Sequence, residues 1–76
     1  MLPNVFDCQA FKIDLAFSGI VVEVRRNSDY RKAMEIAQNT YDKWETSHER
    51  FNLEEKIFDD LITNGIDCRT YTLSYE

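Results

Sequence analysis

The side chains most often used as nucleophiles or soft metal ligands are few in this 76-residue chain: His48, Cys8 and Cys68. Local spacing places no serine–acid or cysteine–acid arrangement around His48. The two cysteines form no CxxC pair, and one histidine gives them a single nitrogen partner, so we expect no structural zinc site. Both cysteines are expected to pack as small apolar side chains in a reducing compartment. If the strands that carry them are neighbours, a disulfide between them is also open.

The acidic pairs offer no better catalytic arrangement. Glu54-Glu55 and Asp59-Asp60 are adjacent in sequence, and adjacent side chains on a helix point about 100° apart, so they cannot share a substrate. The sequence has no glycine-rich phosphate loop and no cluster of metal ligands. A domain of this size leaves little room for a ligand cavity. We therefore predict a protein that is not an enzyme and uses no metal or cofactor.

Four of the nine basic residues fall within eight positions: Arg25, Arg26, Arg31 and Lys32. Free amides at a helix N-terminus together with guanidinium groups can bind phosphate. The plainer interpretation is charge balance, with Arg31 and Glu35 paired one turn apart on a helix. No RNA-binding signature accompanies the cluster, and the rest of the chain is acidic. Nucleic-acid binding by these four residues is therefore the alternative function rather than the main one.

The acidic residues are segregated. Residues 42–67 hold eight acids and three bases, which accounts for the whole net charge of −5. At 100° per residue, Glu35, Asp42 and Glu49 fall within about 40° of one another along roughly 21 Å of helix, and Glu45 adjoins them. Like charges at Glu55 and Asp59, one turn apart, cost a few tenths of a kcal/mol. We predict a partner with a basic surface, bound through these carboxylates: Glu35, Asp42, Glu45, Glu49, Glu55 and Asp59. The plain alternative is a solvated acidic face.

These features predict a small acidic protein that binds another protein without catalysis and acts as a regulator or inhibitor. Its target would be a basic, nucleic-acid-binding surface of a host-defence or nucleic-acid-processing protein. Small acidic proteins of phages and mobile elements work in this way, and the analogy is one of size and charge. An accessory subunit of a larger assembly is a further alternative. No stretch of about 20 apolar residues predicts a membrane span, and the first residues lack signal-peptide features, so we expect a cytoplasmic protein with no membrane partner.

The residues that could position these groups show two periodicities. Apolar and polar residues alternate over 11–17 and over 20–25, with Ser18-Gly19 between them, which predicts a β-hairpin. Residues 1–8 are expected to form a lead-in segment or to extend the first strand. Alternation returns at 69–75, where we expect a last strand with Tyr71, Leu73 and Tyr75 on its apolar side.

Between these strands the period changes to that of a helix. Ser28 is the expected N-cap of a helix that begins at Tyr30 and reaches about residue 50. Its buried stripe, which continues through His48 and Phe51, is Tyr30, Ala33, Met34, Ala37, Tyr41 and Trp44. On that stripe His48 is expected to be a partly buried imidazole, and Tyr41 and Trp44 are expected in the core. Asn52 and Glu55 predict the start of a second helix, which Asn64-Gly65 ends.

The order β-β-α-α-β predicts one α+β domain over residues 1–76. We expect a two-layer sandwich, in which two helices cover one face of a three-stranded, mainly antiparallel sheet. The solvent face of the sheet would carry Lys12, Asp14, Glu23, Arg25, Thr70 and Thr72. Little in the last strand blocks pairing at its edge. A partner or a second copy could therefore add there, with Thr70, Thr72 and Tyr75 near the contact, which gives a homodimer as one outcome.

Overall fold

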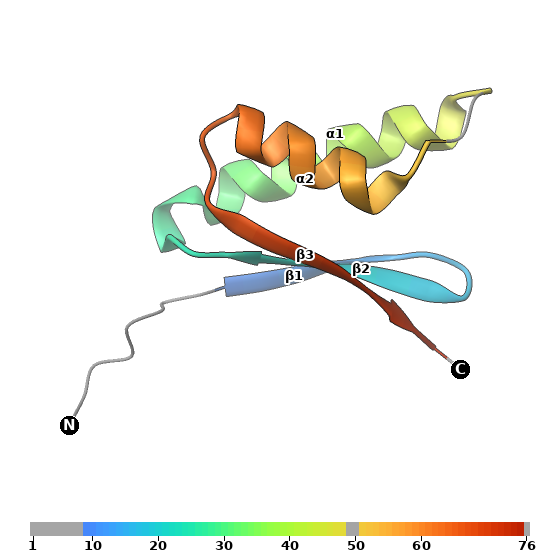
Figure 1. Cartoon of the computed structure of the whole chain (residues 1–76), viewed down its shortest axis with the longest axis horizontal. Helices are drawn as coiled ribbons and strands as arrows, with labels where there is room; N and C mark the ends of the chain where they lie inside the picture. The colour runs from blue at the N-terminus through green and yellow to red at the C-terminus, as the bar shows by residue number, and fades with distance from the viewer. Residues whose placement is uncertain (1–8, 49–50, 76) are drawn as a thin grey trace.

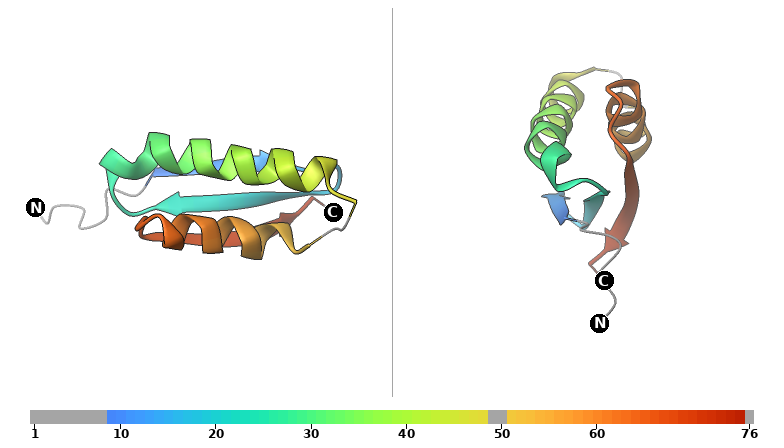
Figure 2. Two further views of the ribbon diagram at one scale, coloured as in Figure 1. Left: turned by 90° about the horizontal axis from the view of Figure 1, so that it is seen from above. Right: turned by 90° about the vertical axis from the view of Figure 1, so that its left-hand side faces the viewer.

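A computed structural model of the chain describes residues 9–48 and 51–75 (Figure 1). The elements are β1 (Gln9–Asp14), β2 (Ser18–Val24), a single 3-10 turn (Asn27–Asp29), α1 (Tyr30–Thr46), α2 (Leu53–Thr63) and β3 (Cys68–Ser74). The strands form one antiparallel sheet in the order β1-β2-β3. Both helices lie on one face of that sheet (Figure 2). The predicted fold class is therefore confirmed, while the segment 1–8 lies outside the described residues.

The core lies between the central strand and the two helices. Ile20, Val22 and Val24 of β2 alternate toward the helices and are almost fully buried. They form one apolar cluster with residues of β1, of both helices and of the α2–β3 connection. The other members are Ile13 of β1, Ala33 and Ala37 of α1, Leu53, Ile57 and Leu61 of α2, and Ile66 of the connection. Burying a side chain such as valine or isoleucine contributes about 1.5–3 kcal/mol. The apolar alternation of β2 is thus what fixes the helical layer to the sheet.

The inner side of β3 is the reverse of the predicted one. The register places Thr70 opposite Val22 and Thr72 opposite Ile20, so both threonines lie on the side of the sheet that faces the helices. Tyr71 and Leu73 lie on the open side and are 40% and 42% exposed. The prediction that placed Thr70 and Thr72 on the solvent face of the sheet, and Tyr71, Leu73 and Tyr75 on the covered face, is therefore wrong.

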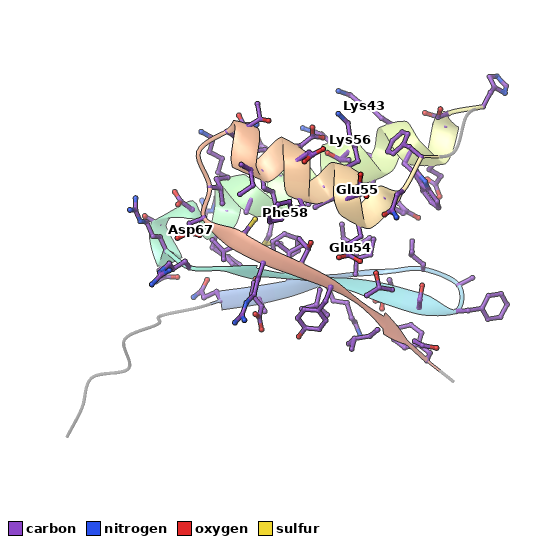
Figure 3. The ribbon with its side chains drawn as sticks, viewed as in Figure 1. Lys43, Glu54, Glu55, Lys56, Phe58 and Asp67 are labelled. Atoms are coloured by element: carbon purple, nitrogen blue, oxygen red, sulfur yellow. The ribbon has the colours of Figure 1, made fainter. Side chains whose placement is uncertain are left out.

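Glu54 of α2 supplies the physical reason. The Thr72 hydroxyl donates to Glu54 Oε1 at 2.6 Å, and the Thr70 hydroxyl donates to Oε2 at 3.4 Å. Figure 3 shows Glu54 between α2 and β3. A polar strand side is tolerated against a helix when its hydroxyls find such acceptors. The edge strand is consequently held to α2 by polar contacts, whereas the central strand is held by apolar packing.

On the open side, Tyr75 follows β3 and lies across Gly19 of β2. A Cβ atom at Gly19 would overlap the Tyr75 hydroxyl oxygen, so only glycine allows the ring to lie there. The Tyr75 hydroxyl donates to Asp14 Oδ1, and Lys12 Nζ lies 5.1 Å from the ring centroid and 3.5 Å from Asp14 Oδ1. These contacts join the two edge strands across the central one.

The same contacts shift two ionisation equilibria. The hydrogen bond from Tyr75 lowers the pKa of Asp14, with the charge of Lys12 acting in the same direction. The pKa of Lys12 is raised, first by Tyr75 and then by the carboxylate of Asp14. The open face of the sheet therefore carries an organised polar and aromatic cluster.

Helix α1 is shorter than predicted at its C-terminal end. It ends at Thr46, whose hydroxyl bonds back to the carbonyl oxygens of Asp42 and Lys43, and Ser47 is extended. The Trp44 indole N–H donates to the Phe51 carbonyl oxygen at 2.9 Å and so joins the helix to the loop before α2. His48 follows the helix and is exposed, so the prediction of a partly buried imidazole is wrong.

The N-terminal end and the buried stripe of α1 also differ from the prediction. The N-cap is Asp29, since the 3-10 turn Asn27–Asp29 precedes the helix and displaces Ser28 from the capping position. Met34 is 43% exposed rather than buried. The deeply buried positions of the helix are Ala33, Ala37 and Thr40, because small side chains let α1 approach both the sheet and α2.

Helix α2 begins and ends where its sequence indicates. The Asn52 side chain accepts a hydrogen bond from the Glu55 backbone N–H at 3.1 Å, as expected of an N-cap. Gly65 has a φ of 77°, the left-handed conformation that favours glycine after a helix. The Ile66 N–H then donates to the Leu61 carbonyl oxygen at 3.0 Å. These signals are local, and the prediction of this helix is confirmed.

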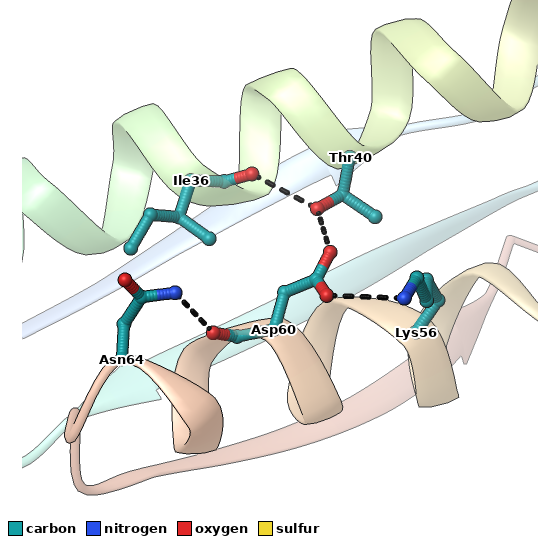
Figure 4. A network of polar contacts seen from close by, with 5 residues as sticks. All are labelled: Ile36, Thr40, Lys56, Asp60 and Asn64. Carbon is teal, nitrogen blue, oxygen red and sulfur yellow. Dashed lines mark hydrogen bonds and ion pairs between the residues drawn. The ribbon is translucent and has the colours of Figure 1, made fainter.

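A polar contact joins the two helices (Figure 4). The Thr40 hydroxyl of α1, with the residue only 3% exposed, lies 2.6 Å from Asp60 Oδ2 and 3.0 Å from the Ile36 carbonyl oxygen. Lys56 Nζ lies 3.2 Å from Asp60 Oδ1, and the Asn64 side chain donates to the Asp60 carbonyl oxygen at 2.7 Å. A buried hydroxyl without such an acceptor would cost about 1–3 kcal/mol. The contact therefore fixes how α1 and α2 lie against each other.

Neither helix in the described ranges is long and apolar enough to span a membrane.

Candidate functional site

The first candidate surface is the outer side of α1, where Glu35, Asp42 and Glu45 are exposed. We call these three residues the α1 ridge. They occupy the side of the helix away from the buried Ala33 and Ala37. From Glu35 to Glu45 the ridge runs about 15 Å along the helix axis. Glu49, the fourth residue predicted for this helix, lies outside the described residues.

Neutral donors are the only hydrogen-bond partners of these carboxylates within residues 9–48 and 51–75. The Gln38 side-chain amide donates to Asp42 Oδ1 at 3.1 Å, and the Tyr41 hydroxyl donates to Glu45 Oε2 at 3.1 Å. The ion pairs of the described chain use four other acids: Asp14, Asp67, Asp60 and Glu23. In the described part of the chain the α1 ridge is therefore a row of negative charges that form no ion pair.

The two predicted acids of α2 do not extend this row. Glu55 and Asp59 are exposed, but Lys56 stands between them in the sequence and pairs with Asp60, the residue that contacts Thr40 of α1. Lys56 therefore lies on the side of α2 that faces α1. Figure 3 shows Lys43 and Lys56 on the outer side of the helical layer. The five described residues of the predicted surface are thus divided by basic side chains into the α1 ridge and a separate acidic pair on α2.

Within the basic cluster, all four side chains are exposed, but acids accompany them. Arg25 Nη1 lies 3.5 Å from Asp67 Oδ2, and the Arg25 backbone N–H donates to the Asp67 carbonyl oxygen at 3.0 Å. Asp29 is the N-cap residue of the helix on which Arg31 and Lys32 lie, without a capping hydrogen bond from its side chain. In the described part of the chain Arg31 forms no ion pair with Glu35. An anion at this helix start would therefore meet two carboxylates as well as the bases.

A third surface is one that the sequence did not indicate. A cavity of about 210 Å³, open to solvent, lies between the first turns of α2 and β3, and its lining is Asn52, Glu54, Glu55, Phe58 and Thr70. We call it the α2–β3 groove. Figure 3 shows Glu54 and Phe58 on the side of α2 that lies over β3. Thr70 and Thr72 alternate with apolar residues in the sequence, but that alternation does not say which side of β3 faces α2. The register places both threonines beneath Glu54.

Two aromatic residues of α1 are part of the fold. Tyr41 and Trp44 are half-buried and pack against the core cluster. Their ring centroids are 6.0 Å apart. The Trp44 indole N–H also donates to the Phe51 carbonyl oxygen and so joins α1 to the loop before α2. The packing of both residues against the core agrees with the core role expected for them.

The groups considered for catalysis are not gathered in one place. Cys68 is half-buried, and burial raises the pKa of its thiol, followed by the nearby charge of Asp67. Cys8 lies outside the described residues, and so does the predicted alternative of a disulfide between Cys8 and Cys68. Among the residues that the structure describes, no three metal-binding side chains are grouped closely enough to hold an ion.

Comparison of the chain with models of known protein families, with curated proteins and with solved structures gave no match.

Proposed function

We propose that this protein works by binding another protein, without catalysis, and that the α1 ridge docks on a basic surface of that partner. The observation that supports this most is that Glu35, Asp42 and Glu45 form no ion pair among the described residues. Exposed carboxylates in a row act mainly on association, since they steer an oppositely charged partner and orient it before contact.

In the narrower form of the proposal the protein is a regulator or inhibitor. A basic surface that binds nucleic acid carries lysine and arginine side chains arranged for phosphates. Carboxylates along one side of a helix offer those side chains a competing set of negative charges. Docking of the α1 ridge on such a surface would exclude the nucleic acid from it.

The alternative, nucleic-acid binding through Arg25, Arg26, Arg31 and Lys32, has weaker support. Asp67 pairs with Arg25, and Asp29 stands at the start of α1. A phosphate group would have to displace the Asp67 carboxylate from Arg25 and approach the Asp29 carboxylate.

The experiment is site-specific photo-cross-linking. A photoreactive side chain replaces Gln38, which is exposed between Glu35 and Asp42, and the cross-linked partner is identified by mass spectrometry. The matched control carries the same group at Ala10, which is exposed on the opposite, open side of the sheet and lies on β1, the edge strand away from β3. The proposal expects a basic protein cross-linked from position 38 and not from position 10. Equal cross-linking from both positions, or a partner without a basic surface, would contradict it.

A further inference from the structure

Among residues 9–48 and 51–75, β3 has β2 on one side and no neighbouring strand on the other. In an antiparallel pair, residues alternate between those that bond the partner strand and those whose backbone groups point away from it. The Arg25 N–H bonds the Asp67 carbonyl oxygen and the Tyr75 N–H bonds the Phe17 carbonyl oxygen, so the odd-numbered residues between Asp67 and Tyr75 bond β2. The backbone N–H and C=O groups of Thr70 and Thr72 therefore point to the open edge.

The other edge of the sheet is less suited to pairing. On β1 the Ala10 carbonyl oxygen accepts a hydrogen bond from the Tyr30 hydroxyl at 3.4 Å. Lys12 and Asp14 place charges along the same strand, a common protection of edge strands. On β3, Arg69 is the one charged residue. The two edges thus differ, and the open one is β3.

The α2–β3 groove lies directly beside this open edge. Two of its lining residues, Glu54 and Glu55, are acidic, and a third, Phe58, offers part of an aromatic ring. Glu54 already accepts hydrogen bonds from Thr70 and Thr72, while the Glu55 carboxylate has no hydrogen-bond or ion-pair partner in the described part of the chain. Carboxylates beside an aromatic ring favour a lysine or arginine side chain.

We propose that an extended segment of the partner adds to β3 as a fourth strand. Successive side chains of a strand point to opposite faces of the sheet. Those on the helix side would enter the α2–β3 groove, and basic residues fit there. Those on the other side would lie beside Tyr71 and Leu73, where apolar residues fit. The partner segment is therefore one that alternates lysine or arginine with apolar residues.

This inference rests on the proposed function in one respect only, the basic character of the partner. A second copy of the chain fits the edge less well. Two β3 strands paired around a two-fold axis would bring Glu54 and Glu55 of one copy toward the same residues of the other, and the charge of each chain is −5. Like charges across an interface oppose association. The charges thus favour a basic segment over self-pairing.

The test uses a short synthetic peptide that alternates lysine with valine, blocked at both ends and as long as β3. Binding to the full chain is measured by NMR titration, with hydrogen exchange of the Thr70 and Thr72 amides as the readout of strand addition. The expected result is slower exchange of these two amides and weaker binding in salt. Two control peptides accompany it: one replaces lysine by glutamate, and one carries N-methyl groups on every amide, which removes the N–H donors from both of its edges and prevents strand pairing. Neither should bind.

Two charge reversals on α2 separate the groove from the general charge of the helix. Glu55→Lys changes a groove residue, and Asp59→Lys changes an exposed acid one turn away that does not line the groove. We expect Glu55→Lys to weaken peptide binding by about fivefold more than Asp59→Lys does, as one partly exposed charge pair allows. In the triple variant of the α1 ridge, Glu35→Lys, Asp42→Lys, Glu45→Lys, peptide binding should still slow the exchange of the Thr70 and Thr72 amides, so that this test and the cross-linking test can fail separately.

Three results would overturn the inference. The first is equal weakening by Glu55→Lys and Asp59→Lys. The second is binding that leaves the exchange of Thr70 and Thr72 unchanged, or no binding of the lysine–valine peptide at all. The third is slow exchange of those amides in the free protein, whether a demonstrated monomer or a dimer paired through β3, because the edge would then already be occupied.

Discussion

Thr72 of β3 donates its hydroxyl hydrogen to Glu54 of α2 at 2.6 Å, and this bond lies on the side of the sheet where the apolar alternation of the strand would have placed tyrosine and leucine. The bond explains two features together. It holds the edge strand beneath α2, and it leaves Tyr71 and Leu73 on the open face.

We expect Thr72→Val to lower the free energy of unfolding by about 1 kcal/mol, although valine is favoured in strands, because the bond to Glu54 is lost. Thr70→Val is the matched control, since its contact with Glu54 is longer, at 3.4 Å, and its loss should cost less. Urea unfolding measures both. Equal or reversed losses would show that β3 does not face α2 in this register.

We expect Thr40→Val to cost about 1–3 kcal/mol, since it removes the donor to Asp60 while that carboxylate stays partly buried between the helices. Thr46→Val is the comparison, because its hydroxyl bonds only carbonyl oxygens of its own helix and is exposed. Thermal unfolding should separate the two variants clearly. A Thr40→Val protein as stable as Thr46→Val would mean that the Thr40–Asp60 bond does not hold the helices together.

Tyr75→Phe should raise the pKa of Asp14 toward its ordinary value, because the hydrogen bond from Tyr75 is the main cause of the lowered pKa. A carboxyl whose pKa is lowered by folding adds stability above its unfolded pKa and loses it as the pH falls through the folded pKa. The stability difference between wild type and Tyr75→Phe should therefore be present at neutral pH and shrink on acidification. Carbon-detected NMR titration of the Asp14 carboxyl gives the pKa directly.

Gly19→Ala tests the same cluster from the central strand. The added methyl group would overlap the Tyr75 hydroxyl oxygen, so we expect the ring to move away and the pKa of Asp14 to rise as in Tyr75→Phe. An unchanged Asp14 titration in both variants would exclude the Tyr75–Asp14 contact.

Cys68 should react slowly with an alkylating reagent at neutral pH. Burial raises the pKa of its thiol, and the thiolate is the reactive form. The rate is measured in a Cys8→Ser variant, which leaves Cys68 as the one thiol of the chain, against the same protein in denaturant. Reaction as fast in the folded as in the unfolded protein would contradict the half-buried position of Cys68.

The sequence predicted those parts of the fold that depend on interactions between residues close to one another in the chain. Asn52 and Gly65 set the ends of α2 through backbone bonds within a few residues, and Ile20 and Val22 indicated the buried side of β2. The inner side of β3 could not be obtained in this way, because a period of two identifies two sides without saying which one faces the helices. Which side of β3 faces the helices depends on Glu54, which lies fourteen or more positions before the residues of β3 in the sequence. It also depends on Gly19, which leaves room for the Tyr75 ring on the open face.

The candidate sites follow the same rule. The outward position of Glu35, Asp42 and Glu45 is a property of one helix, and the spacing predicted it. The separation of Glu55 and Asp59 from that row depends on how α1 and α2 lie against each other, and Thr40 and Asp60 decide this through a bond between residues far apart in the sequence.

The most direct test of the central claim is the rate of association with the cross-linked partner, measured against ionic strength for the wild type and for the triple variant Glu35→Lys, Asp42→Lys, Glu45→Lys. Lys43→Glu, a reversal on the other flank of the same helix, is the comparison variant and changes the net charge in the opposite direction. We predict that the triple variant associates about tenfold or more slowly at low salt and loses the salt dependence, whereas Lys43→Glu associates at least as fast as the wild type. Unchanged association of the triple variant at low salt would contradict the claim and leave the α1 ridge as a solvated face.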